Sequence, residues 1–194
     1  HLLFYCLVRA LLMEFEKERD AFMRSPSFNN YGVINCNAYH RSTAVMDTIK
    51  NNENCEIIYG GNHSNNYNYY IEPTLVKCSD HTQSVFTDEY FAPILTLYIY
   101  DETNLYETMY LSKHTNKYAL TGSVFSSNQR FIDYSKEYFS DKCGNLYIND
   151  KSTGSVVGHQ PFGGSGKSGT NDKSGDINLL YRLFNQQNIK TNIL

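Results

Sequence analysis

The sequence predicts an α/β protein in which helices flank a layered sheet. Strand-like runs rich in isoleucine, leucine and tyrosine alternate along the chain with helix-like runs, which is typical of that class. The 194 residues are enough for one domain with a sizeable core. A content of 41% hydrophobic and 19% charged residues is that of an ordinary soluble globular protein. Neither an internal repeat nor an inter-domain linker is visible, so we expect a single domain.

Two helices are predicted in the first quarter of the chain. Over residues 7–23, leucine and phenylalanine recur at helical spacing with charged residues between them, and Pro26 ends the pattern. Over residues 38–50, Val45 and Ile49 lie on one predicted face.

Three strands are predicted in the next part. Residues 55–59 form a short apolar run that is closed by a glycine pair. Residues 69–76 read as one strand whose pairing is limited by Pro73. Residues 94–100 are rich in isoleucine, leucine and tyrosine, which predicts a buried strand.

The remaining elements alternate regularly. A helix is predicted over 102–112, a strand over 120–126, a helix over 129–139 and a last core strand over 145–149. This order of strands and helices is the basis of the predicted layered sheet.

The most informative segment of the sequence is the run from 147 to 176. It is too polar and glycine-rich to be core, yet apolar residues such as Phe162 distinguish it from a simple linker. A long glycine loop between a strand and a helix is a place where backbone amides contact a ligand. The segment is therefore the first candidate for a binding site.

Two phosphate-binding motifs resemble part of this loop, and neither fits. Residues 164–169 match G-x-G-x-x-G, but that motif opens a helix and needs an acidic residue about 20 positions further on, where this chain has none. Residues 166–168 match the end of a P-loop, but Pro161 stands where that motif needs glycine. A purely structural glycine loop remains the main alternative to a binding loop.

The same loop resembles the substrate-anchoring region of the aldehyde dehydrogenases. Their pattern Pro-Phe-Gly-Gly followed by Ser-Gly is present at 161–164 and 168–169. The words Tyr-Ile-Asn-Asp-Lys-Ser-Thr-Gly-Ser-Val-Val-Gly (147–158) and Ser-Gly-Thr-Asn-Asp-Lys (168–173) resemble the branch that oxidises L-glutamate γ-semialdehyde, the Δ1-pyrroline-5-carboxylate dehydrogenases. The resemblance covers about residues 24–190.

Two further segments agree with this resemblance, each with one departure. Residues 88–93 resemble the family's Glu-x-Phe-Gly-Pro motif, with Ala92 in place of glycine. Residues 118–125 resemble the strand Tyr-Gly-Leu-x-Gly-x-Val-Phe, with Ala119 in place of glycine. Alanine is tolerated at either position if its φ is negative, whereas a positive φ at Ala92 would distort the turn and weaken cofactor binding.

The resemblance implies roles for five residues. Glu89 would accept hydrogen bonds from the nicotinamide ribose of NAD, and Phe91 would pack near the nicotinamide. The backbone amides of Gly164 and Ser165 would bind the α-carboxylate of glutamate semialdehyde, and Phe162 would line its aliphatic stem. Each of three side chains also has a simpler interpretation without a ligand. Glu89 could be a solvated surface acid, Phe91 could pack in the core, and Phe162 could only hold the loop in place.

We expect no catalytic residue and no metal site in this chain. The family's nucleophile lies in a Gly-Gln-x-Cys context that none of the five cysteines has, and Cys6 is flanked by large apolar residues. No C-x-x-C pair supports a metal. The chain begins with His1, so we expect residues 1–194 to be the C-terminal portion of the catalytic domain. The nucleophile, the general base and the N-terminal cofactor domain would then lie upstream, which leaves the predicted sheet incomplete.

Charge and composition limit the classes of partner that we expect for this protein. A net charge of −3 argues against bulk nucleic-acid binding, and no apolar stretch is long enough to cross a membrane. Five widely spaced cysteines suggest reduced thiols in an intracellular compartment. The resemblance further implies a homo-oligomer formed through residues 177–194 and a location in the mitochondrial matrix.

Three other functions stay open at this point. The parent protein could be an aldehyde dehydrogenase with another substrate. The chain could be a non-catalytic interaction protein of the same fold. Residues 164–169 could act as an independent nucleotide-binding module.

Overall fold

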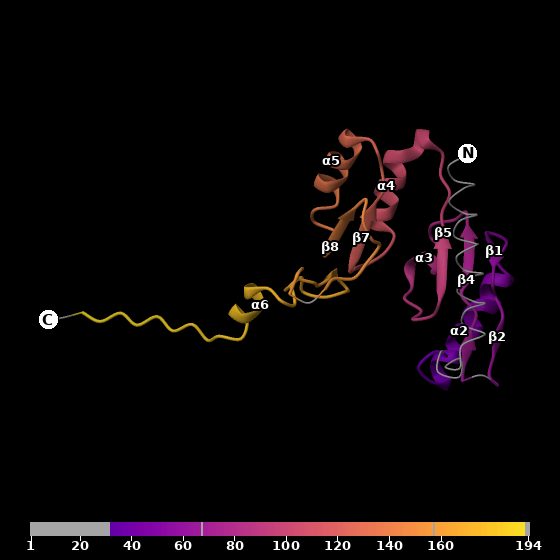
Figure 1. Cartoon of the computed structure of the whole chain (residues 1–194), viewed down its shortest axis with the longest axis horizontal. Coiled ribbons are helices and arrows are strands. Elements are labelled where there is room, and N and C mark those ends of the chain that lie inside the picture. The colour runs from indigo at the N-terminus through magenta and orange to yellow at the C-terminus, as the bar shows by residue number, and fades with distance from the viewer. Residues whose placement is uncertain (1–31, 67, 157, 193–194) are drawn as a thin grey trace. The chain divides into compact units, whose positions relative to one another are not determined.

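The computed structural model describes residues 32–192 except Tyr67 and Val157 (Figure 1). The helix predicted over 7–23 therefore lies outside the described residues. The chain divides into two compact units, with the boundary between Leu111 and Ser112. Each unit is described by itself below.

The first unit opens with helix α2 (Cys36–Lys50), which starts two residues before the predicted range. Its N-cap is Asn35, whose side chain accepts a hydrogen bond from the Ala38 amide at 2.9 Å and so satisfies one of the free N–H groups of the first turn. The buried residues of the helix recur at helical spacing and so form one face. They are Ala38, Tyr39, Ser42, Met46 and Ile49.

Helix α2 packs on a three-stranded sheet in the order β1-β4-β5, which Figure 1 shows side by side. Strand β1 (Cys55–Tyr59) pairs antiparallel with β4 (Thr74–Cys78), and β4 pairs parallel with β5 (Ile94–Leu97). Met46 and Ile49 from the helix and Val76 from the central strand form the buried core. The predicted strand over 55–59 is confirmed. The strand predicted over 94–100 is shorter than expected, and none of its residues is fully buried.

The strand predicted over 69–76 is wrong as a single element. The structure has two strands there, β3 (Tyr70–Ile71) and β4, which belong to different sheets. Strand β3 pairs antiparallel with β2 (His63–Ser64). The break falls at Pro73, which has no backbone N–H to donate to a ladder. Thr74 then begins β4 and donates its amide to the Pro93 carbonyl at 2.8 Å.

Two short helical turns complete the first unit, and one longer helix runs across its boundary. They are α3 (Ser84–Thr87), the 3₁₀ turn η2 (Glu102–Asn104) and α4 (Leu105–His114). The helix predicted over 102–112 therefore begins as a 3₁₀ turn. Asp101 caps that turn by accepting a hydrogen bond from the Thr103 amide at 2.9 Å.

The second unit is built on a strand–helix–strand motif. The parallel strands β7 (Thr121–Val124) and β8 (Asn145–Ile148) are joined through α5 (Gln129–Tyr138), which confirms the three predicted elements within one or two residues of their ends. Parallel neighbours require such a crossover connection. The Asn128 side chain caps α5 by accepting a hydrogen bond from the Phe131 amide at 3.2 Å.

The second unit also contains three short elements, one of which lies inside the glycine loop. Strand β6 (Tyr118–Ala119) pairs antiparallel with β9 (Ser165–Gly166), and a short helix α6 (Ile177–Tyr181) follows the glycine loop. Within residues 32–192, apart from the two gaps, the structure has no helix that is long and apolar enough to span a membrane.

Candidate functional site

The glycine loop is tied to the second unit at two places. Strand β9 pairs Ser165 with Ala119 and Gly166 with Tyr118. Further along, Phe162 and Ser174 form an isolated bridge, in which each amide donates to the other's carbonyl at 3.1 and 2.9 Å. These backbone hydrogen bonds restrict the conformation of the glycine segment.

The turning point of the loop approaches the start of β8 more closely than any side chain would allow. A methyl group on Gly144 would stand 2.0 Å from the Gly163 carbonyl oxygen and 2.6 Å from the Gly164 Cα atom. A methyl group on Gly164 would stand 2.6 Å from the Ser168 Cβ atom. Glycine is required at Gly144 because backbone packs directly against backbone, and at Gly164 because the Ser168 Cβ atom occupies the space of a side chain.

Lys173 holds this close contact together. Its ammonium group donates to the Gly144 carbonyl, to the Gly163 carbonyl at 2.7 Å and to the Asn171 side-chain oxygen at 2.5 Å. The Asn145 side-chain oxygen lies 3.4 Å away. Burial lowers the pKa of Lys173. A single cation therefore bridges two carbonyl groups from different segments, whose partial negative charges would otherwise repel each other.

Asn145 supports the same contact from β8. Asn145 is a buried polar residue. Its side-chain nitrogen donates to the Pro161 carbonyl at 3.1 Å, and its side-chain oxygen accepts from the Gly163 backbone amide at 3.3 Å. Sequence reasoning missed both Asn145 and Lys173 as site residues. Lys173 ends the motif 168–173, which was the only signal that could have pointed to it.

Gly164 and Ser165, the predicted carboxylate anchor, lie between these supports. Gly164 is buried and its carbonyl accepts from the Asn171 amide at 2.8 Å. Within the described part of the chain, no hydrogen bond is donated by the Gly164 amide. The Ser165 hydroxyl donates to the Lys142 carbonyl, so the side chain serves the loop itself. The role of both residues toward a carboxylate stays a prediction.

The phosphate-motif alternatives can be judged from the local geometry. No helix begins directly at or after residues 164–169, because Ser165 and Gly166 are in a strand and the next two residues form a turn. The Ser168 hydroxyl, which a P-loop would direct to a metal, accepts from the Ala119 amide at 3.0 Å. Lys167 is exposed, with its ammonium 5.8 Å from the centre of the Tyr118 ring. The segment is built as a β-turn region and lacks the helix that both phosphate motifs need.

The predicted cofactor residues lie in the first unit, in the segment between α3 and β5. Glu89 is exposed. Phe91 has a left-handed backbone, with a φ of 52°, and its side chain is 77% exposed. Core packing of Phe91 is therefore wrong in this unit. A left-handed backbone costs energy in a bulky residue, and such strain is found preferentially at functional sites.

The structure also answers the question about the two alanines. Neither Ala92 nor Ala119 is among the residues with positive φ. The left-handed position in the first motif is Phe91 instead, so alanine at 92 does not strain the turn. Ala119 is buried in β6, where a small side chain suffices.

A pocket of about 480 Å³ opens beside Phe91 in the first unit. Its lining is mostly apolar and consists of Gly32, Val33, Ile34, Ile71, Phe91, Ala92 and Pro93. Glu89 is not part of this lining. An apolar pocket next to an exposed aromatic ring suits a flat ring system, which is what a nicotinamide presents.

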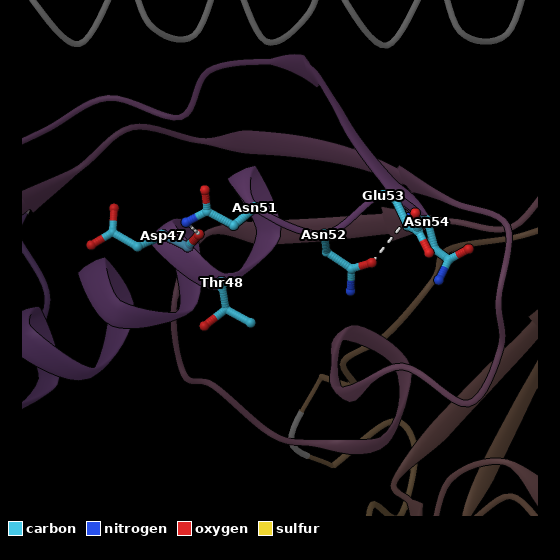
Figure 2. A pocket seen from close by; sticks show the side chains of 6 residues that line it. All are labelled: Asp47, Thr48, Asn51, Asn52, Glu53 and Asn54. Atoms are coloured by element: carbon cyan, nitrogen blue, oxygen red, sulfur yellow. Dashed lines mark hydrogen bonds between the residues drawn. The ribbon is translucent and has the colours of Figure 1, made fainter.

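A second pocket, of about 690 Å³, lies at the C-terminal end of α2 (Figure 2). All six lining residues are polar or charged: Asp47, Thr48, Asn51, Asn52, Glu53 and Asn54. Asn51 donates to the Asp47 carbonyl, and the Asn52 side chain accepts from the Asn54 amide, so these groups satisfy one another locally. None of the predicted site residues lies here, and we interpret this pocket as a solvated depression.

Two of the described cysteines, Cys55 and Cys143, do not have the surroundings of a nucleophile. Burial raises the pKa of the Cys143 thiol, and burial with a neighbouring Cys78 raises that of Cys55 to about 12. Reactive cysteines have the opposite shift. Cys6 lies outside the described residues. Within the described residues, no three histidine, cysteine or acidic side chains are grouped so that they could hold a metal ion.

Comparison with known proteins gives a consistent result. A model of the aldehyde dehydrogenase family matches residues 26–189. The chain is 38% identical over 173 residues to a mitochondrial Δ1-pyrroline-5-carboxylate dehydrogenase of Dictyostelium discoideum, covering 88% of this chain and 31% of that protein. With the enzyme of the same name from Mus musculus it shares 37% identity over 158 residues, covering 81% and 28%.

Solved structures agree. The fold is similar to a Δ-pyrroline-5-carboxylate dehydrogenase from Mycobacterium tuberculosis, with a TM-score of 0.70 and 31% identity, over 78% of this chain and 28% of the other. A structure of that enzyme with bound NAD matches with a TM-score of 0.68. A lactaldehyde dehydrogenase at 24% identity shares the fold, with a TM-score of 0.66. The chain thus spans about 30% of the length of the curated relatives above.

Proposed function

Because this chain belongs to the aldehyde dehydrogenase family, we propose that it supplies the substrate anchor and part of the cofactor site of an NAD-dependent L-glutamate γ-semialdehyde dehydrogenase. The parent enzyme would oxidise the semialdehyde, which is in equilibrium with Δ1-pyrroline-5-carboxylate, to L-glutamate in the breakdown of proline. The observation that carries the proposal is the glycine loop, whose turning point is fixed by Lys173 and Asn145. The names of the relatives support the same substrate.

The loop suits a substrate with a carboxylate at the end remote from the aldehyde. Within the described residues the Gly164 amide donates to no protein acceptor, and the residue itself is buried. An amide of this kind would contribute to an anion nest. The Lys173 ammonium, bound to the neighbouring Gly163 carbonyl, adds a positive charge behind the nest. Together they would favour a carboxylate over a neutral alkyl group.

The cofactor side would be formed by Glu89 and Phe91. An exposed carboxylate accepts two hydrogen bonds and offers no competing donor, which fits the two hydroxyl groups of a ribose. The exposed ring of Phe91, beside an apolar pocket, offers a face to the nicotinamide. NAD would supply the hydride acceptor, and these two residues would orient it.

The nucleophile and the general base would come from another part of a longer protein. The raised pKa values of Cys55 and Cys143 support this division. We further propose that the parent protein is a homo-oligomer that contacts its copies through residues 177–194, and that it works in the mitochondrial matrix, as the names of several relatives indicate for those proteins.

The test is an assay of the longer protein that contains this chain. Purified enzyme would be given NAD and either glutamate semialdehyde or pentanal, which has the same carbon chain without the α-amino and carboxylate groups, and NADH formation would be followed. The proposal predicts a much higher kcat/KM for the semialdehyde. Equal values would indicate an aldehyde dehydrogenase with another substrate. No NADH with any aldehyde would indicate a non-catalytic protein of this fold.

A further inference from the structure

Cys55 and Cys78 face each other across the first unit's sheet. They are direct partners in the antiparallel pairing of β1 with β4, and their sulfur atoms are 3.2 Å apart. Cys78 is almost fully buried, whereas Cys55 is half-buried. Both are free thiols, and the Cys55 thiol donates a hydrogen bond to the Cys78 sulfur.

The ladder places these two residues in the type of pair whose side chains come closest. Next to them, the Ser79 amide donates to the Asn54 carbonyl at 3.0 Å, which identifies Cys55 and Cys78 as a non-hydrogen-bonded pair. The Cα atoms of such pairs are about 4.5 Å apart, within the range of about 4.4–6.8 Å that disulfides span. A bond of about 2.05 Å could therefore form by a small rotation of the side chains, without moving the strands.

We propose that Cys55 and Cys78 form a reversible cross-strand disulfide by exchange with a low-molecular-weight disulfide such as oxidised glutathione. The Cys55 thiolate attacks one sulfur of the small disulfide and releases one thiol. The Cys78 sulfur, as the thiolate, then attacks the Cys55 sulfur and releases the second thiol. The two protein thiols lose two protons and two electrons, and the small disulfide is reduced to two thiols.

The surroundings determine how fast each step is. Burial raises the pKa of Cys55 to about 12, helped by the Cys78 thiol and by Asp80, so the first step is slow at neutral pH. Its rate should rise roughly tenfold per pH unit below that pKa, because only the thiolate attacks. The second step has its sulfur atoms already in contact, so the mixed disulfide should not accumulate. The cross-link should therefore form slowly at neutral pH, which does not suit a fast sensor.

The bond would tie the end of β4 to the start of β1. The start of β4, at Thr74, is hydrogen-bonded to Pro93, which lines the pocket beside Phe91. Cross-linking would therefore stiffen the central strand, whose first residue is bonded to this part of the pocket lining. Neither Cys36 nor Cys143 has a cysteine bonded to it among the described residues, so neither should form such a bridge.

The experiment treats the full chain with oxidised glutathione between pH 7 and pH 9, blocks remaining thiols by alkylation and maps disulfides by mass spectrometry of peptides. We expect a peptide pair linked between Cys55 and Cys78 with a loss of two hydrogen atoms. The C78A variant should instead retain glutathione on Cys55. The matched variants C36S and C143S should still form the link.

Three results would overturn the proposal. One is glutathione that stays on Cys55 in the wild type. Another is a link from Cys55 or Cys78 to a different cysteine. The third is no reaction at pH 9 under conditions in which the urea-unfolded chain reacts. If C78A does not fold, as judged by circular dichroism, C78S provides the same test, because serine is closer in size to cysteine and cannot close a bridge.

Discussion

Gly144 and Gly163 come so close that a methyl group on Gly144 would stand 2.0 Å from the Gly163 carbonyl oxygen. The first residue lies just before β8 and the second lies at the turn of the glycine loop. The Lys173 ammonium donates to the carbonyl groups of both. The position of the proposed carboxylate anchor therefore depends on a backbone contact that the substrate does not touch.

The G144A variant should displace the loop. Overpacking of this kind costs about 1–3 kcal/mol of unfolding free energy. The KM for glutamate semialdehyde should rise more than kcat falls, because the anchor moves while the reacting groups stay in place. Urea unfolding and steady-state kinetics of the parent protein measure both. G154A is the control, because its methyl group enters open space and the cost arises only from a φ of 87°. An unchanged KM in G144A would contradict this account of the loop.

Removal of the Lys173 ammonium should loosen the same contact. K173M leaves the Gly144 and Gly163 carbonyls without their donor, which costs about 1–3 kcal/mol. Selectivity for the semialdehyde over pentanal, measured as the ratio of kcat/KM values, should fall. K173R should restore part of the stability, since it keeps the charge. K167M is the matched control, because Lys167 is exposed and outside this cluster. Equal effects of K173M and K167M would show that Lys173 has no special role.

Loss of the Glu89 charge should weaken cofactor binding and leave the fold intact. Glu89 is exposed, so E89Q should not change the unfolding transition. If the carboxylate binds the ribose, the KM for NAD should rise roughly 10- to 100-fold, which corresponds to the loss of a hydrogen bond to a charged group. D88N alters the adjacent exposed acid and should leave this KM unchanged. Wild-type kinetics in E89Q would remove Glu89 from the cofactor site.

Acid should weaken the turn that precedes α3. The Gln83 side chain and the Thr82 amide and hydroxyl donate to Asp80 and hold its pKa at about 2, below the usual 3.8. The unfolded chain therefore binds this proton more readily than the folded chain does. The contribution of Asp80 is fully present above pH 3.8 and is lost as the pH falls through about 2.

This pH dependence can be measured by following the thermal midpoint between pH 5 and pH 2 in the wild type and in D80N. The loss of stability in that window should be smaller in D80N, since the variant has no carboxyl group to protonate. Parallel curves for the two proteins would contradict the assignment.

Most element positions could be predicted from local patterns. The strand at 55–59, the helix at 129–139 and the strand at 145–149 were found within one residue, because apolar periodicity is decided by neighbours in sequence. The segment 69–76 was not, although Pro73 was recognised as limiting its pairing. Whether a proline interrupts a strand or divides it between two sheets depends on which strands lie on either side, and these are distant in sequence.

The motifs alone determined the family, because a long run of matching residues carries information that does not depend on the fold. They could not reveal Lys173, whose partner Gly144 is 29 residues away. They could not reveal Cys55 facing Cys78 either, since strand register decides which side chains are opposite each other. Tertiary structure decided these contacts because carbonyl groups, ammonium groups and thiols interact over only a few ångströms, and only folding brings such distant segments that close.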